Sequence, residues 1–165
     1  MVIVVMGVSG AGKTTVGRAL APQLGWMFAD GDDYHSAANV EKMRHGIPLT
    51  DLDRETWLES LGWLIKSWLE KKVNAVLACS ALKHAYREKL RVGTEVKFVY
   101  LRGTAELLRQ RLRERHGHFM TEKMLDSQFA TLEEPHDAVV VDIDKSPEEI
   151  VRDIRARLEL VGDGC

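Results

Sequence analysis

The stretch that decides the fold is Val2–Thr14, which reads VIVVMGVSGAGKT. Its fully apolar first part, Val2–Met6, leads directly into the spacing G-x-x-x-x-G-K-T. This spacing is typical of a phosphate-binding loop, which follows a buried strand and opens a helix. A glycine-rich turn that binds no ligand is the alternative, but every fixed position and both flanks fit the motif. The stretch therefore predicts that the protein binds a nucleoside triphosphate.

Each part of this loop has a chemical reason. Glycine lets the backbone approach phosphate oxygens closely and adopt turns that side chains forbid. The backbone N–H groups then form an anion site at a helix N-terminus, where the helix dipole also favours negative charge. We expect Lys13 to reach the β- and γ-phosphates and the Thr14 hydroxyl to coordinate Mg²⁺. The predicted nucleotide-binding residues are Gly7, Val8, Ser9, Gly10, Ala11, Gly12, Lys13, Thr14 and Thr15.

Length and composition limit the remaining possibilities. The chain has 165 residues, which predicts a single domain over 1–165, and 45% of them are hydrophobic, which is enough for a core. A formal net charge of -2 gives no basic surface for nucleic acid. Two scattered cysteines, an apolar start that ends at Gly7 and no run of membrane-spanning length predict a cytoplasmic protein without a membrane partner.

The order of the apolar patterns predicts an α/β fold. Strand-like runs alternate with helical patterns, which is typical of a parallel sheet with helices on both faces. We therefore predict the three-layer fold of phosphate-loop kinases, with a mostly parallel five-stranded sheet and a small lid. The first helix should run over 13–24, with Pro22 kinking it or ending it early. A second helix is predicted over 34–45, and a long helix that begins around residues 49–54 is predicted to end at about 71. Strands are predicted over 2–6, 26–29, 75–79, 97–101 and 138–143.

Acidic residues follow the second predicted strand. Ligands in open α/β sheets bind outside the carboxyl ends of the strands, so Asp30 and Asp32 are placed for metal and acceptor chemistry. For Asp33 we favour a helix cap. The third strand ends in Cys79 and lacks the carboxylate that often supports Mg²⁺ in this fold, which assigns that role to Asp30 together with Thr14. Asp32 would accept or orient the proton of the attacking hydroxyl.

Several polar residues are candidates for binding an acceptor. Arg54 lies in the first turn of a predicted helix, where a cation opposes the dipole, so we expect it to bind an anionic substrate. Ser80, Lys83 and Arg87 follow the third strand and face the same edge. The helix after Arg54 carries a stripe with core spacing, and its tryptophans are therefore interpreted as packing residues: Trp57, Leu61, Leu64 and Trp68.

A basic segment follows the fourth predicted strand. It holds Arg109, Arg111, Arg113 and Arg115 and ends in a glycine-containing loop. A solvated helix face is one explanation. The other, which we favour, is a lid over about 113–122 that brings arginine charge to the transferring phosphoryl group, with Arg115 as a catalytic residue and Arg111 on the nucleotide. The loop after the last strand, with Asp144, should lie near the adenine.

Taken together, these blocks resemble the small gluconokinases of the shikimate-kinase-like type. The resemblance covers almost the whole chain and includes the loop at 7–14, D-G-D at 30–32 with His35 and Asn39, C-S-A-L-K at 79–83 and G-H-F at 117–119. It implies phosphorylation of D-gluconate at its 6-hydroxyl by ATP with Mg²⁺, and a homodimer. The substrate contacts would come from Asp32, His35, Asn39, Arg54, Ser80, Lys83, Arg87 and His118.

Other functions stay open on the residues alone. A kinase of the same fold that acts on shikimate or on a nucleotide would carry the same phosphate loop. A nucleotide-dependent switch or binding module would also carry it, but acidic and basic candidates at the ends of several strands favour an enzyme. A nucleic-acid kinase would need a basic face that the composition lacks.

Overall fold

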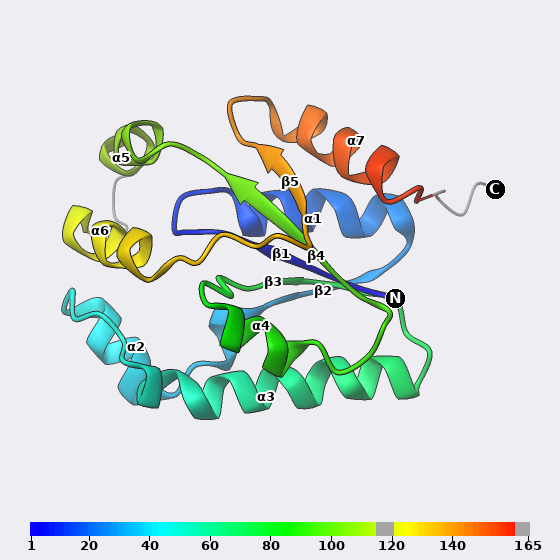
Figure 1. The fold of residues 1–165 in the computed structure, drawn as a ribbon, viewed down its shortest axis with the longest axis horizontal. Coiled ribbons are helices and arrows are strands. Elements are labelled where there is room, and N and C mark those ends of the chain that lie inside the picture. Colours follow the sequence, from blue (N-terminus) through cyan, green and yellow to red (C-terminus); the bar gives the residue numbers. More distant parts are fainter. Residues whose placement is uncertain (115–120, 161–165) are drawn as a thin grey trace.

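Five parallel strands form the sheet at the centre of the molecule, in the order β2-β3-β1-β4-β5 (Figure 1). The structure is a computed structural model that describes residues 1–114 and 121–160. Every neighbouring pair of strands is parallel. The predicted α/β fold is confirmed, and the predicted strand ends differ from the observed ones by at most one residue. The observed strands are β1 (Val2–Met6), β2 (Met27–Asp30), β3 (Ala75–Ala78), β4 (Val96–Arg102) and β5 (Val139–Asp142).

Helices cover both faces of this sheet. In Figure 1, α1 (Lys13–Leu24) and α7 (Pro147–Arg157) lie above it, and α3 (Asp51–Glu70) and α4 (His84–Leu90) lie below it. Three more helices gather beyond the carboxyl ends of the strands. They are α2 (Ala37–Arg44), α5 (Ala105–Glu114) and α6 (Glu122–Thr131).

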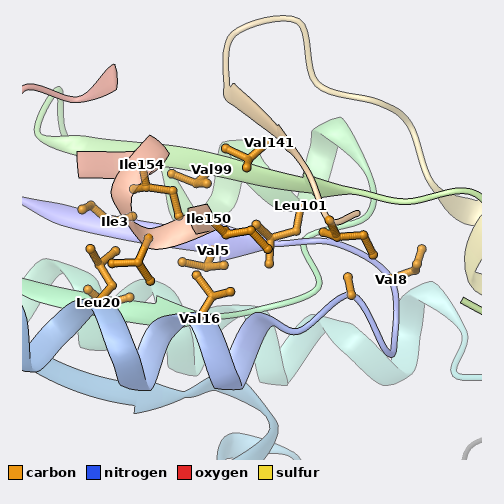
Figure 2. Packing of buried hydrophobic residues seen from close by; sticks show 14 of the residues in the cluster. Ile3, Val5, Val8, Val16, Leu20, Val99, Leu101, Val141, Ile150 and Ile154 are labelled. Atoms are coloured by element: carbon orange, nitrogen blue, oxygen red, sulfur yellow. The ribbon is translucent and has the colours of Figure 1, made fainter. Parts of the chain in front are cut away.

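Strand β1 lies between two hydrophobic cores, one on each face of the sheet. Its five residues are fully buried, because alternate side chains point to opposite faces and both faces are covered. Ile3 and Val5 pack with Leu20 of α1 and Ile154 of α7, as Figure 2 shows. The opposite side chains pack against the predicted stripe of α3, in which Trp57, Leu61 and Trp68 are buried and Leu64 is half-buried. The core interpretation of this stripe is confirmed.

Pro22 does not end the first helix early, which was one of the two alternatives predicted for it. Pro22 lies inside α1, in the last turn, and the helix continues to Leu24. Gly25 then ends the helix, because it adopts the left-handed conformation with φ of 68° and donates its N–H to the last carbonyls.

The predicted helix over 34–45 is interrupted. A 3₁₀ turn, η1 (Gly31–Tyr34), comes first, and α2 starts only at Ala37, because His35 and Ser36 have extended backbones. The cap of α2 is Ser36, whose hydroxyl oxygen accepts a hydrogen bond of 3.1 Å from the N–H of Asn39. The prediction that Asp33 caps this helix is therefore wrong.

The long helix α3 begins with a capping box. Thr50 is the N-cap, and its hydroxyl oxygen accepts from the N–H of Asp53 at 3.1 Å. The Asp53 carboxylate accepts in return from the N–H of Thr50 at 2.9 Å. These hydrogen bonds hold the pKa of Asp53 at about 2, with further help from Lys42. Within the described ranges, no helix is long and apolar enough to cross a membrane.

Candidate active site

A cleft of about 510 Å³ opens at the carboxyl end of the sheet. The phosphate loop and the turn η1 supply part of its wall. Residues from α2, the start of α3, α6 and the loops before α3 and after β3 also line it. Parallel strands end at the same edge of a sheet, so loops far apart in the sequence meet there. The structure thus brings most of the predicted phosphate-binding residues into one cavity with four of the predicted acceptor residues, Asp32, His35, Arg54 and Ser80.

The phosphate loop takes the shape that its glycines permit. Gly7 lies so close to β4 that a Cβ on it would come within 2.9 Å of the carbonyl oxygen of Leu101. Gly12 has φ of 94° and directly precedes α1, whose first residue is Lys13. The Lys13 Nζ donates a hydrogen bond of 3.0 Å to the carbonyl of Val8, so the ammonium group lies over the loop. Cationic charge and the N–H groups of a helix N-terminus therefore face the same cavity.

Gln128 of α6 reaches the same loop and was not predicted from the sequence. Its side-chain oxygen accepts a hydrogen bond of 2.6 Å from the N–H of Ser9, and both residues line the cleft. Gln128 belongs to no motif and lies 119 positions from Ser9, so only the packing of α6 reveals it.

Thr14 and Asp30, which the sequence predicts as Mg²⁺ ligands, lie next to each other in the structure. The Thr14 hydroxyl donates to Asp30 Oδ2 at 2.8 Å, and the other oxygen of Asp30 accepts from the N–H of Asp32 at 3.0 Å. No group of three or more His, Cys, Asp or Glu side chains that could hold a metal occurs in residues 1–114 and 121–160. A hydroxyl and a single carboxylate fit Mg²⁺, which usually keeps several waters and binds substrate phosphates in addition to a few protein oxygens.

The turn that follows this pair, Gly31–Tyr34, is here called the acidic turn. It carries two more carboxylates, Asp32 and Asp33. Asp32 lines the cleft, whereas the exposed Asp33 does not. Gly31 is tightly packed, since a Cβ on it would come within 2.7 Å of the carbonyl oxygen of Ala78 at the end of β3. The fold therefore places Asp32, one residue away from this contact, in the cavity of the phosphate loop.

His35 faces the cleft on the acceptor side. Burial and the nearby Arg54 guanidinium lower its pKa to about 4, so the imidazole is neutral near pH 7. Its Nδ1 lies 3.4 Å from the side-chain nitrogen of Asn39, which is itself buried and donates to the carbonyl of Asp53 at 2.7 Å. Asn39 is thus placed to orient His35. A neutral imidazole is suited to hydrogen-bonding a hydroxyl group.

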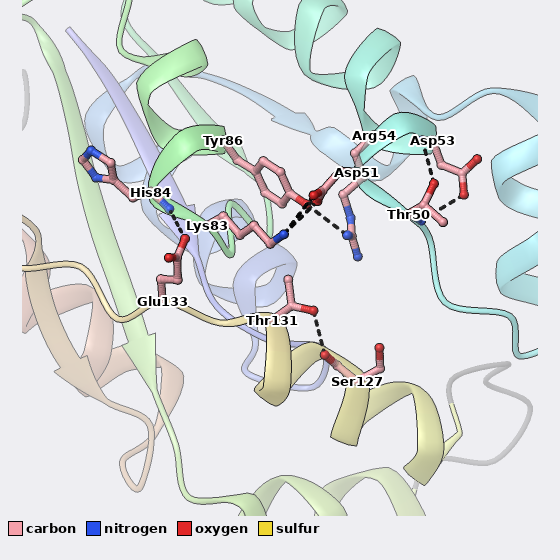
Figure 3. Close-up of polar contacts among 10 residues, drawn as sticks. All are labelled: Thr50, Asp51, Asp53, Arg54, Lys83, His84, Tyr86, Ser127, Thr131 and Glu133. Atoms are coloured by element: carbon pink, nitrogen blue, oxygen red, sulfur yellow. Dashed lines mark hydrogen bonds and ion pairs between the residues drawn. The ribbon is translucent and has the colours of Figure 1, made fainter.

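Arg54 lines the cleft from the first turn of α3. Its Nη1 donates to the hydroxyl oxygen of Tyr86 at 3.2 Å, and that hydroxyl donates to Asp51 (Figure 3). Lys83 Nζ donates to both oxygens of Asp51, at 2.9 and 3.0 Å. The hydrogen bonds from Tyr86 and Lys83 lower the pKa of Asp51. This network positions Arg54, and sequence reasoning missed the part that Tyr86 and Asp51 play in it.

Two predicted substrate contacts lie elsewhere. Lys83 is not part of the cleft wall and pairs with Asp51 instead. Arg87 is 2% exposed and donates to the backbone carbonyls of Ala81 and Glu133, at 2.8 and 2.9 Å. These contacts tie α4 to neighbouring loops, so the assignment of Arg87 to the substrate is wrong. Ser80, by contrast, does line the cleft.

A second cavity of about 290 Å³ lies behind the phosphate loop. Thr15, Arg111 and Lys145 line it, and Arg111 Nη2 donates to the carbonyl of Ile143 at 2.7 Å. Asp144, which lies between Ile143 and Lys145 in the sequence, is exposed. Arg111 of α5 and the loop after β5 therefore meet beside the phosphate loop, although Asp144 itself does not line this cavity. The predicted Arg115 and His118, and most of the predicted lid, lie outside the described residues.

Comparisons with known proteins agree with this geometry. A family model described as an AAA domain matches residues 2–135. The gluconokinase of Gluconobacter oxydans is 48% identical over 93% of this chain and 91% of its own. A sugar kinase from a Janibacter species, solved without ligand, is 42% identical with a TM-score of 0.90, over 97% and 95% of the two chains. A gluconokinase from Sinorhizobium meliloti is 44% identical with a TM-score of 0.85, over 95% and 90%.

Proposed function

This chain belongs to the family of the gluconokinases, and from that premise we propose how its cleft phosphorylates gluconate. The reaction moves the γ-phosphoryl group of ATP to the 6-hydroxyl of D-gluconate and gives ADP and 6-phospho-D-gluconate. The observation that carries the proposal is the shared cleft. Residues of the phosphate loop line the same cavity as Asp32, His35 and Arg54, which we assign to the acceptor side.

The phosphate side supplies positive charge and positioning. Phosphoryl transfer needs little covalent chemistry from the protein, because most of the catalysis comes from alignment and from stabilising the charge on the transferred group. Lys13 and the backbone N–H groups at the start of α1 bind the β- and γ-phosphates. Thr14 and Asp30 would hold Mg²⁺, which neutralises phosphate charge when it is bound. Arg111 and the loop around Asp144 hold the nucleotide from behind the loop.

The acceptor side supplies orientation and a base. Asp32 accepts the proton of the 6-hydroxyl group while the oxygen of that hydroxyl group attacks the γ-phosphorus. The neutral His35 and Ser80 hydrogen-bond hydroxyl groups of the polyol chain, and Asn39 holds His35. Arg54 binds the carboxylate, for which a guanidinium offers two parallel hydrogen bonds. A lid over 113–122 carrying Arg115 and His118, a homodimer and a cytoplasmic location stay predictions from the sequence and the resemblance.

The reaction is tested by measuring ADP release from Mg-ATP with four parallel samples: D-gluconate, shikimate, AMP and no acceptor. We expect release that depends strongly on gluconate, with a phosphorylated six-carbon acid as the product. Release without an acceptor would favour a nucleotide switch. Release with shikimate or AMP would keep the phosphate-loop assignment and overturn the substrate.

Replacing Arg54 by alanine should raise the KM for gluconate about 10- to 100-fold, because a hydrogen-bonded charge pair with the carboxylate is lost. The KM for ATP should stay within about twofold, since Arg54 lies on the acceptor side. Initial-rate kinetics with each substrate varied in turn measures both values. The exposed Arg44 at the end of α2, outside the cleft wall, offers the control Arg44→Ala. A larger change in the KM for ATP than in the KM for gluconate would show that Arg54 acts on the nucleotide and not on the acceptor.

A further inference from the structure

Trp57 of α3 contacts the acceptor side of the cleft at two points. Its indole Nε1 donates a hydrogen bond of 2.7 Å to the carbonyl oxygen of Gly31. Its ring stacks on the imidazole of His35, with the centroids 4.2 Å apart and the planes 15° from parallel. The side chain is only 3% exposed, yet it lines the cleft. One buried side chain therefore joins the two groups that face the acceptor, the acidic turn and His35.

The acidic turn is held between β3 and Trp57. On one side Gly31 is so close to the carbonyl of Ala78 that no side chain fits there. On the other side its own carbonyl accepts the indole N–H. Asp32 follows directly, and its N–H is bonded to Asp30. Loss of the indole N–H would leave the Gly31 carbonyl without this buried partner, which costs more than an ordinary surface hydrogen bond. The turn that carries Asp32 would then shift or loosen.

His35 depends on the same side chain. The indole covers one face of its ring, and Asn39 contacts its Nδ1. Aromatic stacking restricts the position of a ring beyond simple burial of its surface. A movement of Trp57 would therefore move the imidazole and the acidic turn together.

We propose that Trp57 is a positioning residue that sets the placement of Asp32 relative to His35 and thereby orients the acceptor hydroxyl for attack. The inference rests on the proposed function, since it assigns both groups to the acceptor. It goes beyond the core role that the spacing of Trp57 and Trp68 predicts. Both tryptophans are buried on the same face of α3, but Trp68 is not part of the cleft wall.

The test compares Trp57→Phe with Trp68→Phe. Both variants lose the same volume from the same core, but only the first loses the hydrogen bond to Gly31. We expect Trp57→Phe to lower kcat/KM for gluconate about tenfold or more, with the KM for ATP within about twofold. Trp57→Leu should lose more, because the stack on His35 is also removed, and Trp68→Phe should leave both values within about twofold.

A second measurement needs no substrate. Backbone amide exchange over Gly31–Tyr34 should be faster in Trp57→Phe than in the natural protein, and unchanged in Trp68→Phe. If Trp57→Phe fails to fold, NMR spectroscopy of the indole N–H groups of the natural protein replaces the exchange experiment. Addition of gluconate should shift the indole N–H signal of Trp57 and not that of Trp68.

Three results would overturn the proposal. One is an equal loss of activity in the two phenylalanine variants. Another is an equal effect of Trp57→Phe on the KM for ATP and the KM for gluconate. The third is no response of amide exchange or of the indole signal of Trp57. A wrong acceptor would be seen separately, because the natural protein would then not phosphorylate gluconate. The exchange experiment, and kinetics with the acceptor that is turned over, would still test Trp57.

Discussion

Replacing Lys13 by methionine is expected to lower kcat by about 10³-fold or more while the protein stays folded, because the main cation of the phosphate loop is lost. Methionine keeps much of the length of the lysine stem but has no charge to place against the β- and γ-phosphates. The Lys13 Nζ also bonds the carbonyl of Val8. That hydrogen bond is only partly buried, so water can replace the ammonium group there.

ADP release under saturating Mg-ATP and gluconate measures this loss, and urea unfolding followed by circular dichroism checks the fold. Lys89 on α4 is exposed and lies outside both cavities at the phosphate loop, so Lys89→Met removes a lysine without touching the loop. That control should keep near-natural activity. A Lys13→Met protein with near-full activity would show that the loop does not hold the reacting phosphates.

Replacing Asp32 by asparagine should lower kcat by about 10²- to 10⁴-fold, the usual contribution of a positioned general base. Asparagine has nearly the same shape, so the backbone N–H that bonds to Asp30 stays in place. What it lacks is the ability to take the proton of the attacking hydroxyl. The KM for ATP should change little, because Asp32 lies on the acceptor side of the cleft.

The neighbouring Asp33 supplies the matched control. It carries the same charge on the same turn and is exposed like Asp32, but it does not line the cleft. Asp33→Asn should therefore retain kcat within about twofold, and both variants change the net charge of the turn equally. Equal losses in kcat and in ATP affinity for Asp32→Asn would contradict the role of a base. Equal losses for the two variants would show that only the charge of the turn matters.

The fold and the phosphate side of the site could be predicted because they depend on local patterns. Residues 2–14 form one continuous strand, loop and helix start, and each step follows from neighbours in the sequence. Asp30 could be predicted in the same way, because it directly follows the second strand-like run along the chain. The helix at 34–45 was predicted wrongly, because the extended backbones of His35 and Ser36 move the helix start to Ala37.

The acceptor side could be predicted only in part. Lys83 and Arg87 follow the third strand and carry the right charge, but packing turns them to Asp51 and to buried carbonyls. Gln128 and Trp57 gave no functional signal, since one is a polar residue within a helix and the other has ordinary core spacing. Their roles depend on the partners that other segments bring to them.

The sequence by itself determined the class of the sheet and the phosphate loop and supplied the candidate reacting groups, because short-range spacing and chemical type are enough for these. Only the tertiary structure decided which charges face the cleft and which are used inside the protein. The reason is physical: a cation that packing buries beside carbonyls donates its hydrogen bonds to them, whatever role its type suggests. Arg54 and Arg87 have the same guanidinium, yet the packing of α3 and α4 gives one to the cleft and the other to the interior.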